Sequence, residues 1–259
     1  MIRVVVGGAT GRLGGMVCSL IAGQEDMRLV GGVVSAGSEN VNRPVGPGVY
    51  AVGSDRIASV VENADVYVDL TSPQAAERNL QAVRRKGLNY VVGTTGVAPQ
   101  AMKAFESAVK EDGASAVVAP NFSIGVNVFF KTCEQLARAL EDYDVEIVEV
   151  HHNQKKDAPS GTARQAAEII AQATGTTKMV YGRQGNVGAR GREIGIHSIR
   201  SGDVVGEHTV IFAGRKERIE LTHRAHSREA FAEGCIEAIR WVASRSDGRI
   251  HSMSEVLGL

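Results

Sequence analysis

Short apolar runs alternate with amphipathic segments along the first half of the chain. Strand-like runs occupy 2–6, 28–34, 64–71, 89–95 and 115–122, and helical periodicity fits 12–22, 57–63, 73–87 and a segment that ends near 112. The segment 73–87 has proline in its first turn and glycine at its end, as helix boundaries prefer. Several of the strands are apolar along most of their length, which indicates burial on both faces. The pattern therefore predicts a parallel sheet covered by helices on both sides.

The pattern changes after Asn121. A helix is expected at about 125–142, a strand at 144–152 and a further helix from Ser160, whereas 176–195 is glycine-rich and basic and is expected to form a loop. The runs "IHSIR", "EHTVIFAG" and "RIELTHRA" are separated by the turns "SGD" and "GRKE", so we expect antiparallel strands. Segregated strands after a parallel region indicate a second, α+β domain.

Composition and charge exclude several classes of partner. The chain has 259 residues, and its 29 lysines and arginines balance its 29 acidic residues, so no global field attracts nucleic acid or an anionic membrane. The three cysteines are far apart and show neither paired nor zinc-binding spacing, so we expect free thiols in a reducing compartment and no metal site. No apolar run approaches the roughly 20 residues that span a bilayer, and the first residues enter a strand at once. We therefore expect a cytoplasmic protein that acts on a small molecule.

A glycine-rich turn, "GGATGRLGG" at 7–15, joins the first strand to the first helix. Backbone N–H groups at such a helix start bind a pyrophosphate when glycines let the ligand approach, although the spacing also suits a tight turn without a ligand. The second strand ends in Val34 and Ser35 rather than in an acid, and the nearest carboxylate is Glu39. Nothing there would repel a 2′-phosphate, and Ser35 or Arg43 could bind one, which favours NADPH slightly over NADH. The loops 93–96 and 119–127 follow further strands and are expected to border the nicotinamide.

The segment "HHNQKKDAPSGTA", 151–163, concentrates titratable groups at a strand end. His151 and His152 should point to opposite faces, and the neighbouring Lys155 would repel a cation, which argues for catalysis over metal binding. Ser160, Gly161 and Thr162 open the next helix. They form either a plain N-cap or, together with Lys155, a site for a substrate carboxylate.

The chain resembles the dihydrodipicolinate reductase family over nearly its whole length. "GATGRLG", "VDLTSP", "VVGTTG", "APNFSIGVNVF", "EVHHNQKKDAPSGTA" and "GDVVGEHTVIF" occur in the order of that family, and the histidine-lysine segment is its most specific motif. The resemblance implies an α/β protein with an amino-terminal Rossmann-type parallel sheet and a second α+β domain built on an open mixed sheet. It also implies a homotetramer, and a cofactor domain of 1–122 plus 232–259 that includes the last helix, with 123–231 binding substrate and forming the oligomer.

The resemblance also implies the site residues. His151 matches the proton donor and Lys155 the second catalytic residue, while His152, Gly161 and Thr162 match substrate contacts, with Ser160 adjoining. The cofactor contacts would be Gly8, Ala9, Thr10, Gly11, Arg12, Leu13, Gly93, Thr94, Thr95, Ala119, Pro120, Asn121 and Phe122, and Ser35 is added by position. The family commonly carries an acid, often followed by a basic residue, where this chain has Val34 and Ser35. NAD(P)H would reduce a cyclic dicarboxylate of lysine and diaminopimelate biosynthesis.

Two other functions fit parts of the sequence. Another NAD(P)-dependent reductase of this architecture, such as an amino-acid dehydrogenase, would need the glycine turn but not the whole histidine-lysine segment. A nucleotide-sensing regulator would bind the cofactor without oxidising it.

Overall fold

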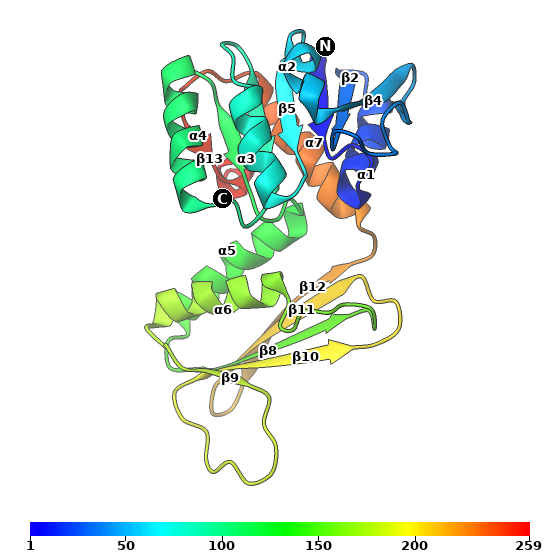
Figure 1. Cartoon of the computed structure of the whole chain (residues 1–259). Coiled ribbons are helices and arrows are strands. Elements are labelled where there is room, and N and C mark those ends of the chain that lie inside the picture. The colour runs from blue at the N-terminus through cyan, green and yellow to red at the C-terminus, as the bar shows by residue number, and fades with distance from the viewer. The chain divides into compact units, whose positions relative to one another are not determined.

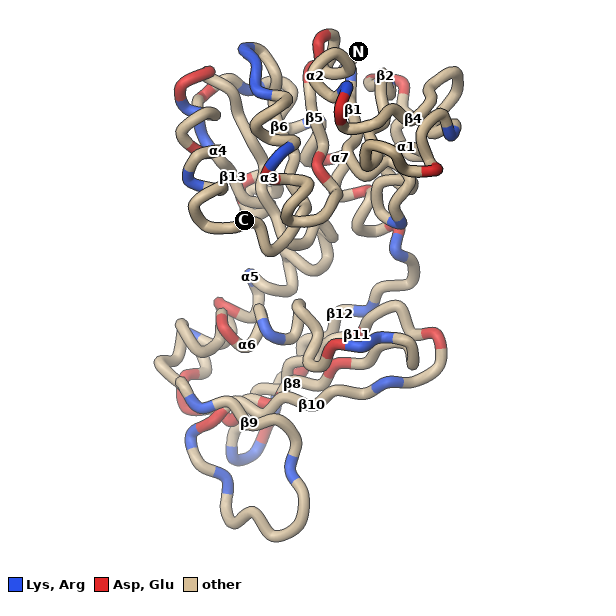
Figure 2. Tube along the Cα trace, in the orientation of Figure 1, with Lys and Arg blue, Asp and Glu red and all other residues tan.

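The computed structural model describes residues 1–259 as two compact units (Figure 1). The first comprises Met1–Ile124 with Glu229–Leu259, and the second comprises Gly125–Arg228. The boundaries predicted from the sequence lie within a few residues of these. Acidic and basic residues are interspersed along both units (Figure 2). No helix combines the length and apolar character needed to cross a membrane.

A largely parallel sheet forms the centre of the first unit. Its order is β13-β7-β6-β5-β1-β2-β4-β3, in which the chain moves outward on one side of β1 and then returns to its other side. The strands are β1 Ile2–Gly7, β2 Met27–Val34, β3 Pro44–Gly46, β4 Val49–Gly53, β5 Val66–Asp69, β6 Asn89–Val92, β7 Ala116–Val118 and β13 Ile250–His251. This is the doubly wound order of dinucleotide-binding sheets, which place ligands at the carboxyl ends of the strands where the order reverses.

Helices cover both faces of this sheet (Figure 1). They are α1 Arg12–Ala22, α2 Ile57–Val61, preceded by a short 3-10 turn at Ser54–Arg56, α3 Pro73–Ala82, α4 Pro99–Asp112, α7 Glu229–Ala243 and α8 Met253–Leu257. Val4 and Val6 of β1 pack with α1, α7 and α8, and Val5 packs with the helices on the other face. This alternation explains why β1 is apolar along its length. The predicted parallel sheet is confirmed.

The second unit is an open mixed sheet with two helices on one face (Figure 1). Its order is β12-β11-β8-β10-β9, with β8 parallel to β10 and antiparallel to β11. The strands are β8 Asp144–His151, β9 Met179–Tyr181, β10 Ile194–Arg200, β11 Gly206–Ala213 and β12 Arg218–Ala225, and the helices are α5 Ile124–Ala139 and α6 Gly161–Thr174. The mixed-sheet prediction is confirmed. All three cysteines are buried and unpaired, as expected from their spacing.

Strand adjacency in the second unit differs from the sequence prediction. "IHSIR" and "EHTVIFAG" run in opposite directions, but β8 lies between them, so they do not pair. The loop that joins them is hydrogen-bonded to the end of β8, where the Ser201 N–H donates to the carbonyl of His151 at 2.8 Å. A turn sequence indicates that the chain reverses its direction, but not whether another strand lies between the two strands that it joins. The short strands β3, β4, β9 and β13 were also missed.

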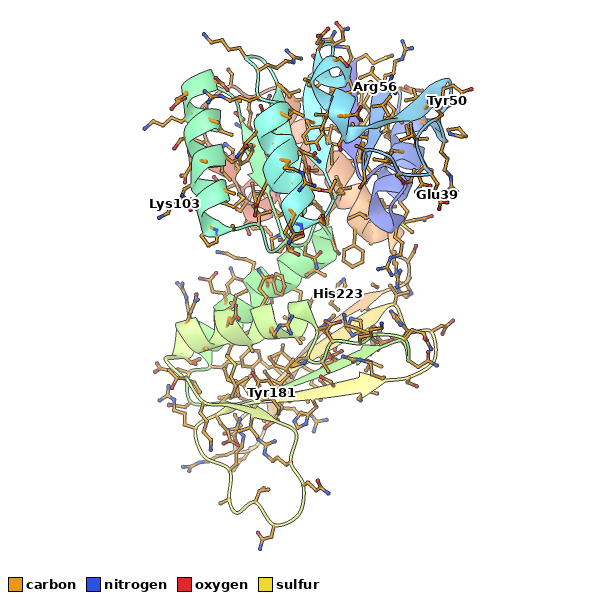
Figure 3. All side chains as sticks on the ribbon, in the orientation of Figure 1. Glu39, Tyr50, Arg56, Lys103, Tyr181 and His223 are labelled. Atoms are coloured by element: carbon orange, nitrogen blue, oxygen red, sulfur yellow. The ribbon has the colours of Figure 1, made fainter.

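The glycine-rich segment 176–195 contains β9 and a loop whose arginines pair with acids of the sheet. Arg183 binds Glu146 through both terminal nitrogens, at 2.8 and 3.0 Å, and Arg190 donates to Glu146 at 3.1 Å. Tyr181, labelled in Figure 3, stands exposed at the end of β9. These arginines therefore have a structural role in anchoring the loop.

Candidate active site

The turn between β1 and α1 requires glycine at two positions. Gly8 has φ of +78°, and a Cβ there would lie 2.3 Å from the Leu70 carbonyl oxygen. A Cβ on Gly14 would lie 2.1 Å from the carbonyl oxygen of Gly8. The N-cap residue of α1, Gly11, supplies no side-chain cap, and the first turn contains no acid. The first N–H groups of α1 are therefore available to an anion.

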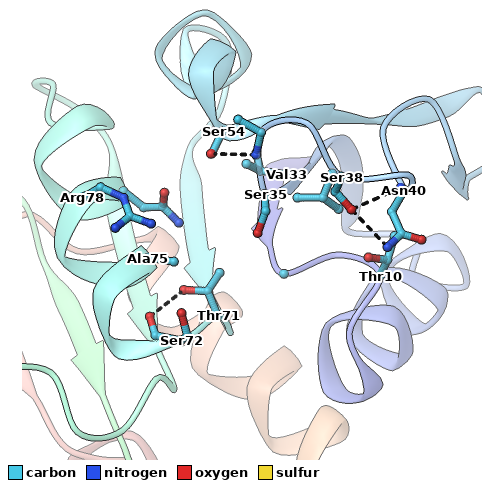
Figure 4. A pocket seen from close by; sticks show the side chains of 14 residues that line it. Thr10, Val33, Ser35, Ser38, Asn40, Ser54, Thr71, Ser72, Ala75 and Arg78 are labelled. Atoms are coloured by element: carbon cyan, nitrogen blue, oxygen red, sulfur yellow. Dashed lines mark hydrogen bonds between the residues drawn. The ribbon is translucent and has the colours of Figure 1, made fainter.

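A cavity of about 490 Å³ lies beside this turn (Figure 4). Predicted residues Gly8, Thr10 and Ser35 line it, together with residues from the ends of β2 and β5 and from α3. The further lining residues are Val33, Val34, Ala36, Ser38, Asn40, Ser54, Thr71, Ser72, Ala75, Arg78 and Asn79. Ala9, Arg12 and Leu13 do not line it. Glu39, which is labelled in Figure 3, is exposed and also absent from the lining.

Arg43 lies outside this cavity. Its guanidinium donates to Asn40 Oδ1 at 3.1 Å, and it borders a separate cavity with Ala9, Thr10 and Gly15. Arg78 of α3 lines the first cavity, whereas Arg43 does not. Sequence reasoning missed it because a cation in the middle of a helix is usually a solvated one.

Two further predicted loops follow β6 and β7. Thr94 donates to Asp69 Oδ1 at 2.7 Å and accepts from the Thr71 N–H at 2.8 Å. Asp69 is fully buried and also accepts from the hydroxyls of Tyr67, at 2.8 Å, and Thr71, at 2.6 Å. It therefore ties the ends of β5 and β6 together. Asp69 belongs to the motif "VDLTSP", but the sequence predicted no role for it.

Phe122 is a packing residue in this structure. Its side chain is buried in the core, and its ring would lie 2.6 Å from a Cβ on Gly93. Ala119 is also buried. Any contribution of these two residues to a ligand site is therefore through the backbone of their loop, whereas Thr95 and Pro120 are exposed. The backbone of Phe122 in turn contacts α7, where a Cβ on Gly234 would meet its carbonyl oxygen.

In the second unit, a buried carboxylate holds the first predicted catalytic residue. Glu149 of β8 is fully buried, and its Oε2 lies 2.5 Å from His151 Nδ1. Its oxygens also accept two hydrogen bonds from Arg200, both at 2.9 Å, and one from the Ser160 N–H at 3.1 Å. A carboxylate only accepts, so the proton of a neutral His151 resides on Nδ1. Nε2 has no hydrogen-bond partner within the chain.

The charges of these groups depend on one another. Burial raises the pKa of Glu149, but hydrogen bonds from Arg200, Ser198 and His151 outweigh it and hold the pKa at about 2. The pKa of His151 is lowered, mainly because the ring is buried. The hydrogen bond and the charge of Glu149 raise this pKa, whereas the charges of Lys155 and Arg200 lower it further. Glu149 is therefore ionised at neutral pH and favours the protonated form of His151.

Lys155 and His152 flank this pair. Lys155 Nζ donates to Asp157 Oδ1 at 2.9 Å, which lowers the pKa of that carboxyl group. His152 Nε2 lies 3.3 Å from Arg228 Nη2, away from the Glu149 pair. The predicted divergence of the two histidines is therefore observed.

The start of α6 separates into a buried cap and open amides. Ser160 is 2% exposed, and its hydroxyl accepts from the Ala163 N–H at 3.2 Å and lies 3.0 Å from His208 Nε2. The Ser160 hydroxyl is thus engaged in contacts within the protein. The N–H groups of Gly161 and Thr162 have no partner within the chain and are open to an anion.

Two further histidines lie behind His151. The rings of His151 and His208 are 5.1 Å apart, and His223, labelled in Figure 3, is 6.4 Å from His208. Burial is the main cause that lowers the pKa of His208 to about 3, and it also lowers that of His223. Both rings are therefore neutral at physiological pH.

Comparisons with known proteins agree with this geometry. The family models described as "Dihydrodipicolinate reductase, N-terminus" and "Dihydrodipicolinate reductase, C-terminus" match residues 2–122 and 125–257. The chain belongs to the dihydrodipicolinate reductase family. Proteins named 4-hydroxy-tetrahydrodipicolinate reductase from Methanocaldococcus jannaschii and Methanosarcina barkeri are 48% and 45% identical to it. Each comparison covers 100% of this chain, and 98% and 100% of those proteins respectively.

A solved structure of a dihydrodipicolinate reductase agrees with this assignment. The dipicolinate-bound dihydrodipicolinate reductase from Paenisporosarcina sp. TG-14 superposes with a TM-score of 0.83 at 28% identity, covering 98% of both chains. A diaminopimelate dehydrogenase of C. glutamicum gives a TM-score of 0.58 at 16% identity, with 98% of this chain and 93% of that one covered, and shares the fold alone. The resemblance predicted from the motifs is confirmed, as are the fold and the class of enzyme, an NAD(P)H-dependent oxidoreductase family of lysine and diaminopimelate biosynthesis.

Proposed function

We propose that the protein converts 4-hydroxy-tetrahydrodipicolinate to tetrahydrodipicolinate with a hydride from NAD(P)H and a proton, and that the 4-hydroxyl group of the substrate leaves as water. The observation that carries the proposal is the Glu149-His151 pair, which lies in one unit with Lys155 and the open amides of α6. An amino-acid dehydrogenase or a nucleotide sensor would have no need for this complete group, and the named relatives are reductases of this substrate.

The cofactor would be held by the first unit. The glycine turn and the start of α1 suit a pyrophosphate, and the cavity beside Gly8, Thr10 and Ser35 suits the adenosine ribose. The loops at Gly93–Thr95 and Ala119–Phe122 would border the nicotinamide, which supplies a hydride when it is bound. Because no carboxylate lines the cavity, we propose NADPH as the preferred form.

The substrate carboxylates would be bound by the second unit. Lys155 supplies a positive charge and Gly161 and Thr162 supply helix-start amides, the two kinds of donor that a dicarboxylate requires. Lys155 would also stabilise the negative charge that develops on the ring as it accepts hydride. His152 would contact the substrate from the side, and buried Ser160 would hold the start of α6 in place.

His151 would supply the proton that completes the reduction. Glu149 keeps a proton on Nδ1, so a protonated His151 releases the proton from Nε2 and becomes neutral while its orientation stays the same. A dianionic substrate beside the ring would favour the protonated form before the transfer. Solvent would then recharge Nε2 for the next turnover.

We further propose that the protein is a homotetramer formed through the open face of its second sheet. Val148, Val150, Ile199 and Ile211 lie on the face opposite α5 and α6, and Ile199 is 44% exposed. A row of aliphatic side chains on an uncovered sheet face is typical of a protein-protein interface.

The activity is tested by the loss of reduced-nicotinamide absorbance with substrate generated from pyruvate and aspartate semialdehyde by the preceding synthase. We expect consumption that requires the synthase and is greater with NADPH than with NADH. Cofactor binding without consumption would favour the sensor, and consumption with amino or keto acids alone would favour a dehydrogenase.

A further inference from the structure

The lining of the adenosine-side cavity has an unusual charge distribution. Arg78 is its only charged residue, and the remaining polar lining consists of hydroxyls and amides, including Ser35, Ser38 and Ser54. In Figure 4 the Arg78 side chain extends from α3 on the opposite side of the cavity from Ser35 and Ser54. The cavity therefore offers one cation and several neutral donors, with no acid to neutralise the cation.

Arg78 has no partner within the chain. Nearby Arg84 binds Asp112 and Glu111, at 2.8 and 2.7 Å, and Arg85 donates to backbone carbonyl groups. Arg78 makes no ion pair and no side-chain hydrogen bond, although it has the same donors. An unpaired guanidinium beside a cavity is suited to binding an anion from outside the chain.

The position of Arg78 is fixed by its neighbour in the sequence. Asn79 is 5% exposed and donates to buried Asp69 Oδ2 at 3.2 Å. Asp69 also holds Thr71 at the end of β5, so α3 and the β5 loop have one rotational setting relative to the sheet. That setting directs the residue before Asn79 toward the cavity.

The end of β2 lacks the group that would compete with a phosphate. Dinucleotide sites for NAD usually carry an acid that binds the ribose 2′-hydroxyl, whereas sites for NADP replace it with a cation nearby. Here Val34 and Ser35 end the strand, Glu39 does not line the cavity, and Arg43 borders a different one. The cation that faces Ser35 across the cavity is on α3.

We propose that Arg78, with Ser35, Ser38 and Ser54, forms the site for the 2′-phosphate of NADPH. The site would bind a phosphate monoester as its dianion, with the guanidinium supplying paired N–H donors and the serines supplying hydroxyl donors. This proposal rests on the proposed use of NAD(P)H and deepens it by naming the residue that sets the choice between the two cofactors.

The test is calorimetric titration of the full chain with 2′,5′-ADP and with 5′-AMP, which share the adenosine 5′-phosphate and differ in the 2′-phosphate. Arg78→Gln should weaken the binding of 2′,5′-ADP by roughly 10- to 100-fold, which is the usual effect of losing a charge-assisted pair. The affinity for 5′-AMP should change by no more than about twofold. Arg43→Gln is the matched control, because it removes a nearby arginine that does not line this cavity, and it should change the affinity for neither fragment.

Steady-state kinetics provide the second measurement. Arg78→Gln should reduce the ratio of kcat/KM for NADPH to that for NADH by roughly the same factor, with kcat at saturating NADH unchanged. The proposal would be overturned if Arg78→Gln lost affinity equally for both fragments, or if Arg43→Gln rather than Arg78→Gln lost affinity for 2′,5′-ADP. It would also be overturned if the unmodified protein bound 2′,5′-ADP no more tightly than 5′-AMP. Failure of the reductase assay alongside retained discrimination between the two fragments would overturn the proposed reaction but leave this site standing.

Discussion

Replacement of Glu149 by glutamine should separate two roles of this carboxylate, its contribution to the free energy of unfolding and its effect on the pKa of His151. The substitution keeps the size of the side chain but removes the charge that accepts from Arg200 and His151. Hydrogen bonds to charged groups contribute about 1.5–3 kcal/mol each, and glutamine retains one acceptor oxygen. We expect a loss of about 2–3 kcal/mol of unfolding free energy, which for a chain of this size lowers Tm by roughly 4–12 °C.

The catalytic effect should appear in the pH dependence. Glu149 raises the pKa of His151, so its neutralisation lowers that pKa further. A proton donor is active below its pKa, and the decline of kcat at alkaline pH should therefore begin at a lower pH in the variant. The loss of turnover should reach about 10²-fold at neutral pH, the scale for impairing an acid-base group.

Glu146→Gln is the matched control for this experiment. Glu146 is on the same strand and has its pKa held at about 2 by Arg183, His197 and Arg190 despite its partial burial. It should lose thermal stability without any change in the pH profile. Thermal unfolding and kcat between pH 5.5 and 9 are measured for both variants. A Glu149→Gln enzyme with a lower Tm and an unaltered profile would refute the positioning role.

Four further predictions concern single groups. His151→Gln should reduce kcat about 10²-fold, while Lys155→Ala should raise KM and lower kcat together, both measured in the coupled assay; an unchanged kcat in the first variant would remove His151 from the role. Folding lowers the pKa of His208 from 6.5 to about 3, so the contribution of neutral His208 to the free energy of unfolding is fully present above about pH 6.5 and is lost on acidification at up to ~1.4 kcal/mol per pH unit. His208→Asn should therefore reduce the change in Tm between pH 7 and pH 5. An equally steep dependence of Tm on pH in the variant would contradict this prediction. Ile199→Lys should dissociate the oligomer in sedimentation, whereas Ile219→Lys, at a similarly exposed residue on the other sheet face, should not; intact oligomers in both would exclude the open face.

The parallel sheet was predictable because burial on both faces gives strands such as β1 and β6 nearly continuous apolar sequence. The pairing of β10 with β8 was not, because the turn after Arg200 shows only that the chain reverses. Two-residue and three-residue strands such as β13 and β9 leave no periodicity to detect.

The predicted site residues differ in how far the sequence could place them. The motif around His151 predicted the catalytic group that we propose, but its buried partner Glu149 has the pattern of one more acidic position in an alternating strand. Arg78 is a similar case, because only the three-dimensional setting of α3 shows that it lines the cavity with Ser35. Long-range contacts of this kind have no local sequence signal.

The central claim is tested most directly by following the hydride itself. NADPH deuterated at the transferable position of the nicotinamide is mixed with the enzyme and with substrate supplied by the synthase, and the product is analysed by mass spectrometry. We predict one deuterium in tetrahydrodipicolinate for each NADPH oxidised, and a rate about 10²-fold lower in His151→Gln. Oxidation of the cofactor without deuterium in that product would contradict the assignment.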